Sequence, residues 1–303
     1  TMEWINSHNE RMLNTLGVRY NYDFNVNTDS SLKLSLFTCD SEAVSYINSK
    51  KRELTEKIDS LGWKYKKYND YLNKLKKLVL GIDDVIYDNI TESFNWKNIA
   101  EDELRTYIDG LKKEREKLEI ELEKAHKKAF GREVEKISVK NDAKSEYFEL
   151  KNKADILLNV LDLTSVLEIE EHEKNLIDSK VLAVTGEAGI GKSQLFANEV
   201  KVLGREKRCS IIFLGGLYNT NEPIANQIVK ECSLDCSFEY LLSLLETIGA
   251  ETDKDVIIFI DALNETWNKN LWEVYLPTII SYVEQFKNIK LAFSYRTEYK
   301  EIL

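Results

Sequence analysis

The chain has 303 residues and a formal net charge of −10, from 42 basic and 52 acidic side chains. This acidity argues against a protein that coats nucleic acid through a generally basic surface. Hydrophobic residues make up 43% of the chain, enough for packed cores, whereas 2 prolines and 12 glycines are too few for a linker-rich protein. No apolar run approaches the ~18 residues of a membrane span, so we expect no membrane partner.

Cysteine and histidine positions give no sign of a metal site. The chain has four cysteines: Cys39, Cys209, Cys232 and Cys236. Their spacing is not that of a zinc site, and we expect each to be a small buried hydrophobic residue. Free thiols suit a reducing compartment, which favours a cytoplasmic location. Three histidines in polar helical sequence are expected at the surface: His8, His126 and His172.

Residues 1–60 are expected to form a mixed N-terminal segment. Helical spacing covers Met2–Leu16, and Gly17 follows where that helix should end. Aromatic residues then alternate with Asn and Asp over residues 19–31, a composition typical of turns and extended chain. Helical spacing returns at Ser41, whose hydroxyl suits an N-cap.

Residues 61–130 are expected to form a helical adaptor region. Between Trp63 and Leu80, apolar residues recur three or four positions apart and lysines fill much of the rest, which predicts a basic amphipathic helix. Its basic face could contact nucleic acid or an acidic partner, or it could be the solvated face of a packing helix. Because lysine is common on helix surfaces, the second interpretation is preferred.

The strongest helical pattern covers residues 101–130. Its apolar stripe consists of Leu104, Ile108, Leu111, Leu118, Leu122, Ala125 and Ala129. Such a stripe suits an antiparallel hairpin with an earlier helix or a short coiled coil. The hairpin is preferred, because the preceding region also carries an apolar stripe. Residues 131–175 are then expected to be a linker with a short lead-in helix around residues 149–167.

Residues 176–303 alternate between strand and helix patterns. Strands are predicted at residues 180–186, 209–216, 255–263 and 289–296. Helices are predicted between them, at residues 192–204, 221–232, 237–249 and 271–286. This alternation predicts a parallel sheet flanked by helices. The expected fold is therefore α/β, preceded by a helical adaptor, and the glycine-rich motif described next indicates that the α/β part is a partial P-loop NTPase domain.

A glycine-rich motif follows the first predicted strand and opens a helix. It fits G-x-x-x-x-G-K-[ST] with Gly186, Glu187, Ala188, Gly189, Ile190, Gly191, Lys192 and Ser193. Glycines let backbone amides turn toward phosphate oxygens, and the helix N-terminus favours the same negative charge. In this motif Lys192 would reach the β- and γ-phosphates, and the Ser193 hydroxyl would ligate Mg²⁺.

Three later residues complete the predicted site. Asp261 ends a run of apolar residues and could hold Mg²⁺, partly through water. Glu265 follows four residues later and could activate a water molecule. Arg296 ends the last predicted strand and could contact the γ-phosphate. No [NT]-K-x-D guanine motif follows, so ATP is expected rather than GTP.

The last ~125 residues resemble the first part of a STAND NTPase of the NACHT-like group. The resemblance rests on "VTGEAGIGKSQL", "FIDALNE" and "LAFSYRTEY", which hold the Walker A and Walker B motifs and a sensor arginine. "FIDALNE" is especially similar to bacterial antiviral STAND proteins of the Avs type. "LGVRYNYDFNV", residues 16–26, also resembles a segment found ahead of the NTPase in many bacterial members.

The resemblance implies an ATP-dependent switch in anti-phage defence. It also implies a homo-oligomer on activation, a phage-derived trigger bound by a C-terminal sensor, and nucleic acid contacted only through an effector. Neither sensor nor effector is visible, so we expect an internal fragment. Asn264 stands where many NACHT domains have aspartate, which predicts slow hydrolysis. Thr297 stands where proline often follows the arginine. The alternatives are an AAA+-type remodelling ATPase and a helical scaffold with a vestigial P-loop.

Overall fold

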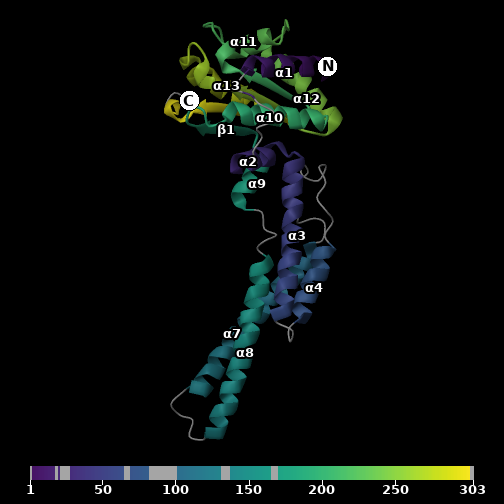
Figure 1. Ribbon diagram of the computed structural model, residues 1–303, viewed down its shortest axis with the longest axis vertical. Coiled ribbons are helices and arrows are strands. Elements are labelled where there is room, and N and C mark those ends of the chain that lie inside the picture. Colours follow the sequence, from purple (N-terminus) through teal and green to yellow (C-terminus); the bar gives the residue numbers. More distant parts are fainter. Residues whose placement is uncertain are drawn as a thin grey trace. The chain divides into compact units, whose positions relative to one another are not determined.

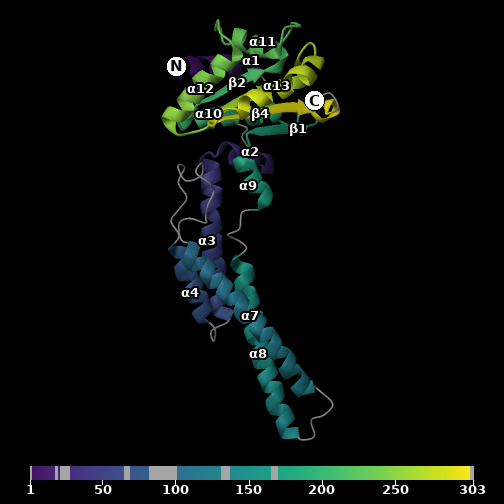
Figure 2. The same ribbon diagram turned by 180° about the vertical axis from the view of Figure 1, so that it is seen from behind.

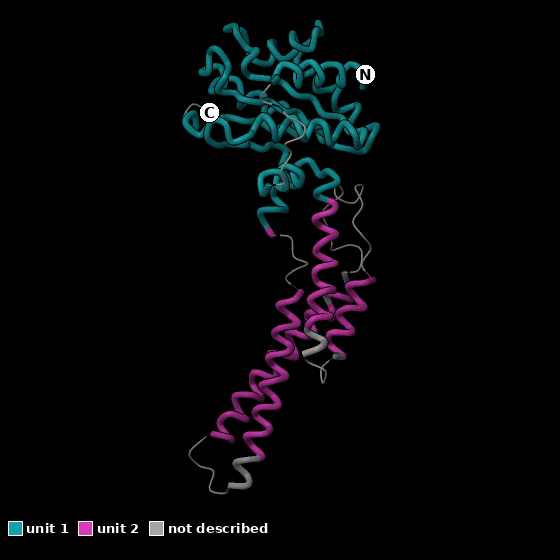
Figure 3. The backbone as a smooth tube through the Cα atoms, in the orientation of Figure 1, with its two compact units in different colours: residues 1–43, 171–303 teal, residues 44–170 magenta. Residues whose placement is uncertain are grey.

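The computed structural model describes residues 2–17, 20, 28–64, 69–81, 101–130, 137–164 and 170–300. It divides the chain into two compact units, coloured separately in Figure 3. The first unit joins residues 1–43 to residues 171–303, and the second comprises residues 44–170. Residues 1–43 of the expected N-terminal segment therefore belong with the α/β unit, and residues 44–60 belong with the second unit. The division differs from the expected one, in which residues 1–60 and 131–175 stand apart.

A four-stranded parallel sheet forms the centre of the first unit (Figure 1). Its strands are β1 (Val181–Gly186), β2 (Ser210–Leu214), β3 (Val256–Asp261) and β4 (Ile289–Arg296). They lie in the order β1-β4-β3-β2, and every neighbouring pair is parallel. All four predicted strands are confirmed within a few residues. Because the strands are parallel, their carboxyl ends share one edge of the sheet.

Helices cover both faces of the sheet (Figures 1 and 2). One face packs against α11 (Ile224–Glu231), α12 (Phe238–Thr252) and α13 (Asn270–Glu284), with Ile258, Ile260 and Trp272 among the buried residues. The other face packs against α10 (Lys192–Arg205) and α2 (Asp29–Thr38). Strand residues alternate between the two cores, which explains why β2 and β3 read as unbroken apolar runs.

Helix α1 (Met2–Leu16) covers the outer edge of β2. The Asn9 side chain donates to the Ser210 carbonyl at 2.7 Å and accepts from the Ile212 amide at 3.1 Å. His8 Nε2 lies 2.9 Å from the Ile212 carbonyl oxygen. Side chains thus satisfy backbone groups that an exposed edge strand would leave open. The predicted helix is confirmed, but the expected surface position of His8 is wrong, because this side chain is buried.

Helix α2 was not predicted, because the composition of residues 19–31 indicated turns and extended chain. Its N-cap is Thr28, whose hydroxyl accepts from the Ser31 amide at 3.2 Å, while the Thr28 amide donates to the Ser31 hydroxyl. The following helix, α3 (Ser41–Lys64), is capped by Asp40 rather than by Ser41. Asp40 Oδ1 accepts from the backbone amides of residues 42 and 43. Helix α9 (Glu171–Asp178) packs against α2.

The described part of the second unit is helical and contains most of α3, with α4 (Asn69–Leu80), α7 (Glu101–Phe130) and α8 (Ile137–Thr164). All four contribute to one apolar core, which includes Leu54, Leu75, Leu118 and Leu157. Helix α7 matches its predicted bounds. The expected helix across residues 63–80 is instead the end of α3 and all of α4, and the residues between them lie outside the described part.

The main partner of α7 is α8, not an earlier helix as expected. His126 contacts Tyr147, and Glu114 pairs with Lys153 at 2.7 Å, so the two helices run antiparallel. Most of the residues expected to form a linker and a lead-in helix therefore belong to α8 of this hairpin, and α9 begins at Glu171. Among the described helices, none is long and apolar enough to cross a membrane.

Candidate nucleotide-binding site

The glycine-rich loop between β1 and α10 needs glycine at two positions. Gly189 has φ +80° and Gly191 has φ +94°, values that residues with a Cβ rarely adopt. At Gly186 a Cβ would meet only the end of the exposed Ile190 side chain, which can move aside, so glycine is not required there. Gly191 caps α10 without a side-chain hydrogen bond, and the first N–H groups of any helix lack intrahelical partners. The loop and helix start can therefore offer backbone donors to an anion.

Lys192, the first residue of α10, folds back over the loop. Its ammonium donates to the Gly186 and Glu187 carbonyls, both at 2.8 Å. Burial, followed by repulsion from Arg296, lowers the pKa of Lys192, while Asp261 opposes the shift. The loop lysine is thus held close to a second cation, in surroundings that favour an anion.

Asp261 ends β3 as a buried carboxylate, 1% exposed. Ser294 on the neighbouring strand β4 donates to Asp261 Oδ1 at 2.5 Å. The same hydroxyl accepts from the Ala262 amide at 2.8 Å. Ala262 has φ +56°, so the backbone turns sharply just after the acid. Ser294 therefore fixes both the carboxylate and the turn that follows it.

The turn continues as the short helix η6 (Leu263–Glu265). The Asn264 side-chain oxygen accepts from the Arg296 amide at 3.0 Å, which ties the turn to the end of β4. Arg296 also places its guanidinium 3.8 Å from Glu265 Oε1. Both side chains are partly exposed, so this ion pair is weak and free to rearrange around a ligand.

A second set of contacts fixes the far side of this turn. Thr266 donates to the Gly215 carbonyl at 3.0 Å and accepts from the Trp272 indole at 2.8 Å. A Cβ at Gly215 would overlap the Ala262 carbonyl, so glycine allows the close approach of η5 (Gly215–Leu217). Contacts on both sides of the turn therefore hold the backbone around Asp261 in place.

These elements enclose a pocket of about 300 Å³ at the carboxyl edge of the sheet. Its lining comprises Ala188, Gly189, Gly191, Lys192, Ser193, Gln194, Asp261, Ala262, Asn264, Glu265, Ser294 and Arg296. Two cations and two carboxylates thus face one small volume beside a helix N-terminus. This arrangement suits an anionic ligand that carries a divalent cation.

Most of the predicted site residues meet in this pocket. Gly186, Glu187 and Ile190 are not among its lining residues, although the first two hold Lys192. The sequence interpretation assigned no role to Ser294, and the register β3–β4 explains its position: Ile260 pairs with Phe293, so the next residues, Asp261 and Ser294, are neighbours. A polar residue inside an apolar strand was the available signal.

No protein-family model, curated protein or solved structure matches this chain. The resemblance of the motifs to a known family therefore remains an expectation, and the geometry of the pocket carries the functional argument.

Proposed function

We propose that the α/β unit is part of a P-loop NTPase domain that binds ATP with Mg²⁺ and acts as a nucleotide-dependent switch. One observation carries the proposal: Lys192, Asp261 and Arg296, more than 100 positions apart at the extremes, line one pocket beside a helix N-terminus. A glycine-rich turn that matched the motif by chance would not be expected to lie beside a buried carboxylate and a second cation.

The residues of the pocket fit this ligand. Lys192 would exchange its two carbonyl acceptors for the β- and γ-phosphates, both of which are stronger acceptors because they are charged. The Ser193 hydroxyl and the Asp261 carboxylate provide the oxygen ligands that Mg²⁺ prefers, the second partly through water. Arg296 would turn from Glu265 toward the γ-phosphate. Glu265 would then orient the attacking water.

The proposed output is a change of assembly rather than continuous work. By resemblance to the STAND group, ATP binding would favour a homo-oligomer that couples a sensor for a phage-derived trigger to an effector. On this proposal the protein acts in the bacterial cytoplasm as an antiviral switch with slow ATP hydrolysis. The pocket supports nucleotide binding, whereas the assembly, trigger and effector rest on the resemblance alone.

Titration calorimetry with ATP and MgCl₂ tests the binding site in the intact 303-residue chain. The Lys192→Ala variant removes two charged contacts to phosphate and should weaken ATP binding about 100-fold. Lys201→Ala changes a lysine on the same helix that does not line the pocket, and should bind ATP as the wild type does. Equal ATP affinity of the wild type and Lys192→Ala would refute the assignment.

A second measurement separates a switch from a remodelling ATPase. Glu265→Gln should keep ATP affinity and lower an already slow hydrolysis rate, because the carboxylate would act only on water. Sustained rapid turnover by the wild-type chain would favour a remodelling enzyme, and a wild-type chain that binds no ATP would favour a scaffold.

A further inference from the structure

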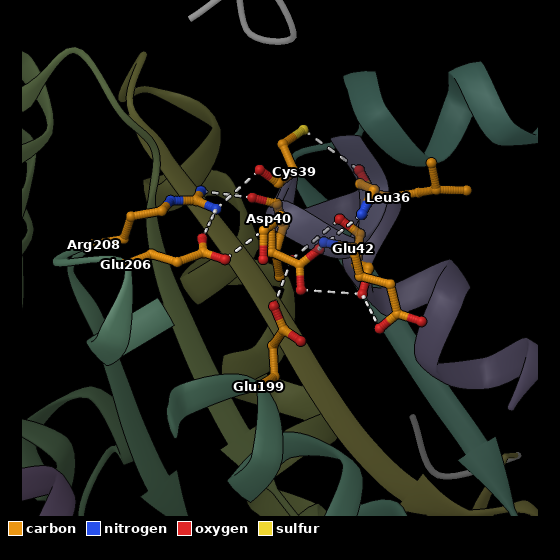
Figure 4. A network of polar contacts seen from close by, with 11 residues as sticks. Leu36, Cys39, Asp40, Glu42, Glu199, Glu206 and Arg208 are labelled. Atoms are coloured by element: carbon orange, nitrogen blue, oxygen red, sulfur yellow. Dashed lines mark hydrogen bonds and ion pairs between the residues drawn. The ribbon is translucent and has the colours of Figure 1, made fainter. Parts of the chain in front are cut away.

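The C-terminus of α2 lies in an unusually polar and buried cluster, shown in Figure 4. A helix C-terminus leaves its last carbonyls without intrahelical partners. Here buried cations donate hydrogen bonds to these carbonyls. Arg208 donates to the carbonyls of Thr38 and Cys39, at 2.6 and 3.0 Å. Lys290 donates to Phe37 at 2.9 Å and also to Ile177 at the end of α9. These contacts hold α2 in place on the sheet unit.

Helix α10 contributes one residue to this cluster, Glu199 (Figure 4). Its Oε1 accepts from the Thr38 hydroxyl at 2.6 Å. Both side chains are buried, with Glu199 6% and Thr38 0% exposed. This contact joins α2 directly to the helix that begins at Lys192. Glu199 lies two helical turns after that lysine, or about 10 Å along the axis.

The charges around Glu199 do not favour its ionised form. The charged and titratable groups that face the cluster are Cys39, Asp40, Glu42, Glu206, Arg208, Asp255 and Lys290. Arg208 donates to two backbone carbonyls and forms an ion pair with Glu206 at 3.8 Å. Lys290 forms an ion pair with Asp255 at 3.4 Å. Burial first, and then repulsion from Asp40, raise the pKa of Glu199 to about 8. The hydrogen bond from Thr38 and the charge of Arg208 oppose this shift in pKa but do not cancel it.

We propose that Glu199 and Thr38 form a proton-sensitive latch that holds α2 on α10 while the Glu199 carboxyl is neutral. Ionised Glu199 would be a buried charge that Arg208 compensates only in part, and undocking of α2 would admit water to it. The latch precedes the start of the helical unit in the sequence, since Ala43 is the last residue of the first unit. The inference does not depend on the proposed nucleotide site.

The direction of the pH dependence follows from the two states of Glu199. An undocked, hydrated carboxyl has an ordinary pKa of 4.5. Between pH 4.5 and about pH 8, the docked state retains a proton that the undocked state releases. Raising the pH through this window therefore favours undocking, by up to about tenfold per pH unit, and the effect ends above the upper limit. Asp40, whose pKa is also raised by burial, adds to the effect with the same sign.

Hydrogen exchange of the α2 amides in the intact chain tests the latch. Rates are measured from pH 5.5 to pH 9 and corrected for the intrinsic pH dependence of amide exchange. The opening equilibrium of α2 should rise steeply to about pH 8 and then level off. In Glu199→Gln, which keeps the acceptor for Thr38, the slope should fall below about threefold per pH unit.

Two variants and an internal reference make the result decisive. Thr38→Val removes the hydroxyl donor and should raise α2 opening about five- to tenfold. Glu231→Gln changes another buried acid, on α11, and should leave the α2 profile unchanged. The β3 amides should stay protected throughout. The latch is overturned if wild-type α2 opening is independent of pH, if Glu199→Gln follows the wild type, if Thr38→Val has no effect, or if β3 and α2 lose protection together.

Discussion

Replacing Ser294 with alanine tests how the candidate site is held together. The change removes the hydrogen bond to Asp261 Oδ1 and the acceptor of the Ala262 amide in one step. Ser294 is completely buried, so water cannot replace either contact without a structural shift. The alanine side chain differs only by the hydroxyl, and the expected effect is therefore electrostatic rather than steric.

The size of the effect follows from these two contacts. Loss of a hydrogen bond to a charged group costs about 1.5–3 kcal/mol, and an unsatisfied buried amide costs about 1–3 kcal/mol. We expect Ser294→Ala to lower the free energy of unfolding of the α/β unit by about 3 kcal/mol. If the site holds Mg²⁺·ATP, its affinity should fall about tenfold.

Urea-dependent hydrogen exchange of the β3 amides measures this stability in the α/β unit by itself. Calorimetry with and without MgCl₂ then separates the metal-dependent part of ATP binding, which alone should weaken. Ser281→Ala, at an exposed position of α13, serves as the control and should change stability by less than about 0.5 kcal/mol. A Ser294→Ala variant as stable as this control would show that the Ser294 contacts do not hold the turn.

Two further substitutions test other parts of the first unit. Asn9→Ala leaves the Ser210 carbonyl and Ile212 amide at the β2 edge unpaired and should cost about 2–4 kcal/mol in urea unfolding, whereas Asn14→Ala, exposed on the same helix, should be neutral. Burial raises the pKa of Glu231 to about 7, so wild-type stability should decline as the pH rises from about 4.5 to 7. Glu231→Gln should match the wild type at pH 4 and exceed it by up to about 3 kcal/mol at pH 8; an equal difference at both pH values would contradict this.

The α/β part of the fold was predictable because its signals are local. Each strand is a compact apolar run, and the helices between them have clear periodicity or caps. Helix α13 spans Pro277 as predicted, since its apolar spacing continues on both sides of the proline. The loop, Asp261 and Arg296 were recognisable because parallel strands bring their carboxyl ends to one edge.

The contacts that the sequence did not reveal are those between distant segments. The edge-covering role of α1 depends on Asn9 meeting β2, some 200 residues later. Helix α8 carries a sparse stripe, with Ala143 and Ile156 buried and Leu150 only partly buried between them. Such a stripe can be recognised as a packing surface only when its partner helix α7 is known. Helix α2 had a local signal, the Thr28–Ser31 capping box, but the aromatic, Asn-rich residues before it obscured that signal.

Asn264 shows how the geometry changes the meaning of a sequence difference. Its side-chain oxygen accepts from the Arg296 amide, a contact that aspartate could make equally well. Asparagine in place of aspartate therefore leaves the turn intact and removes one negative charge from the pocket wall. Two carboxylates of the pocket lining, Asp261 and Glu265, then face Lys192 and Arg296. If the pocket binds ATP as proposed, this balance should favour retention of the polyphosphate over its rapid turnover, which is the behaviour that a switch requires.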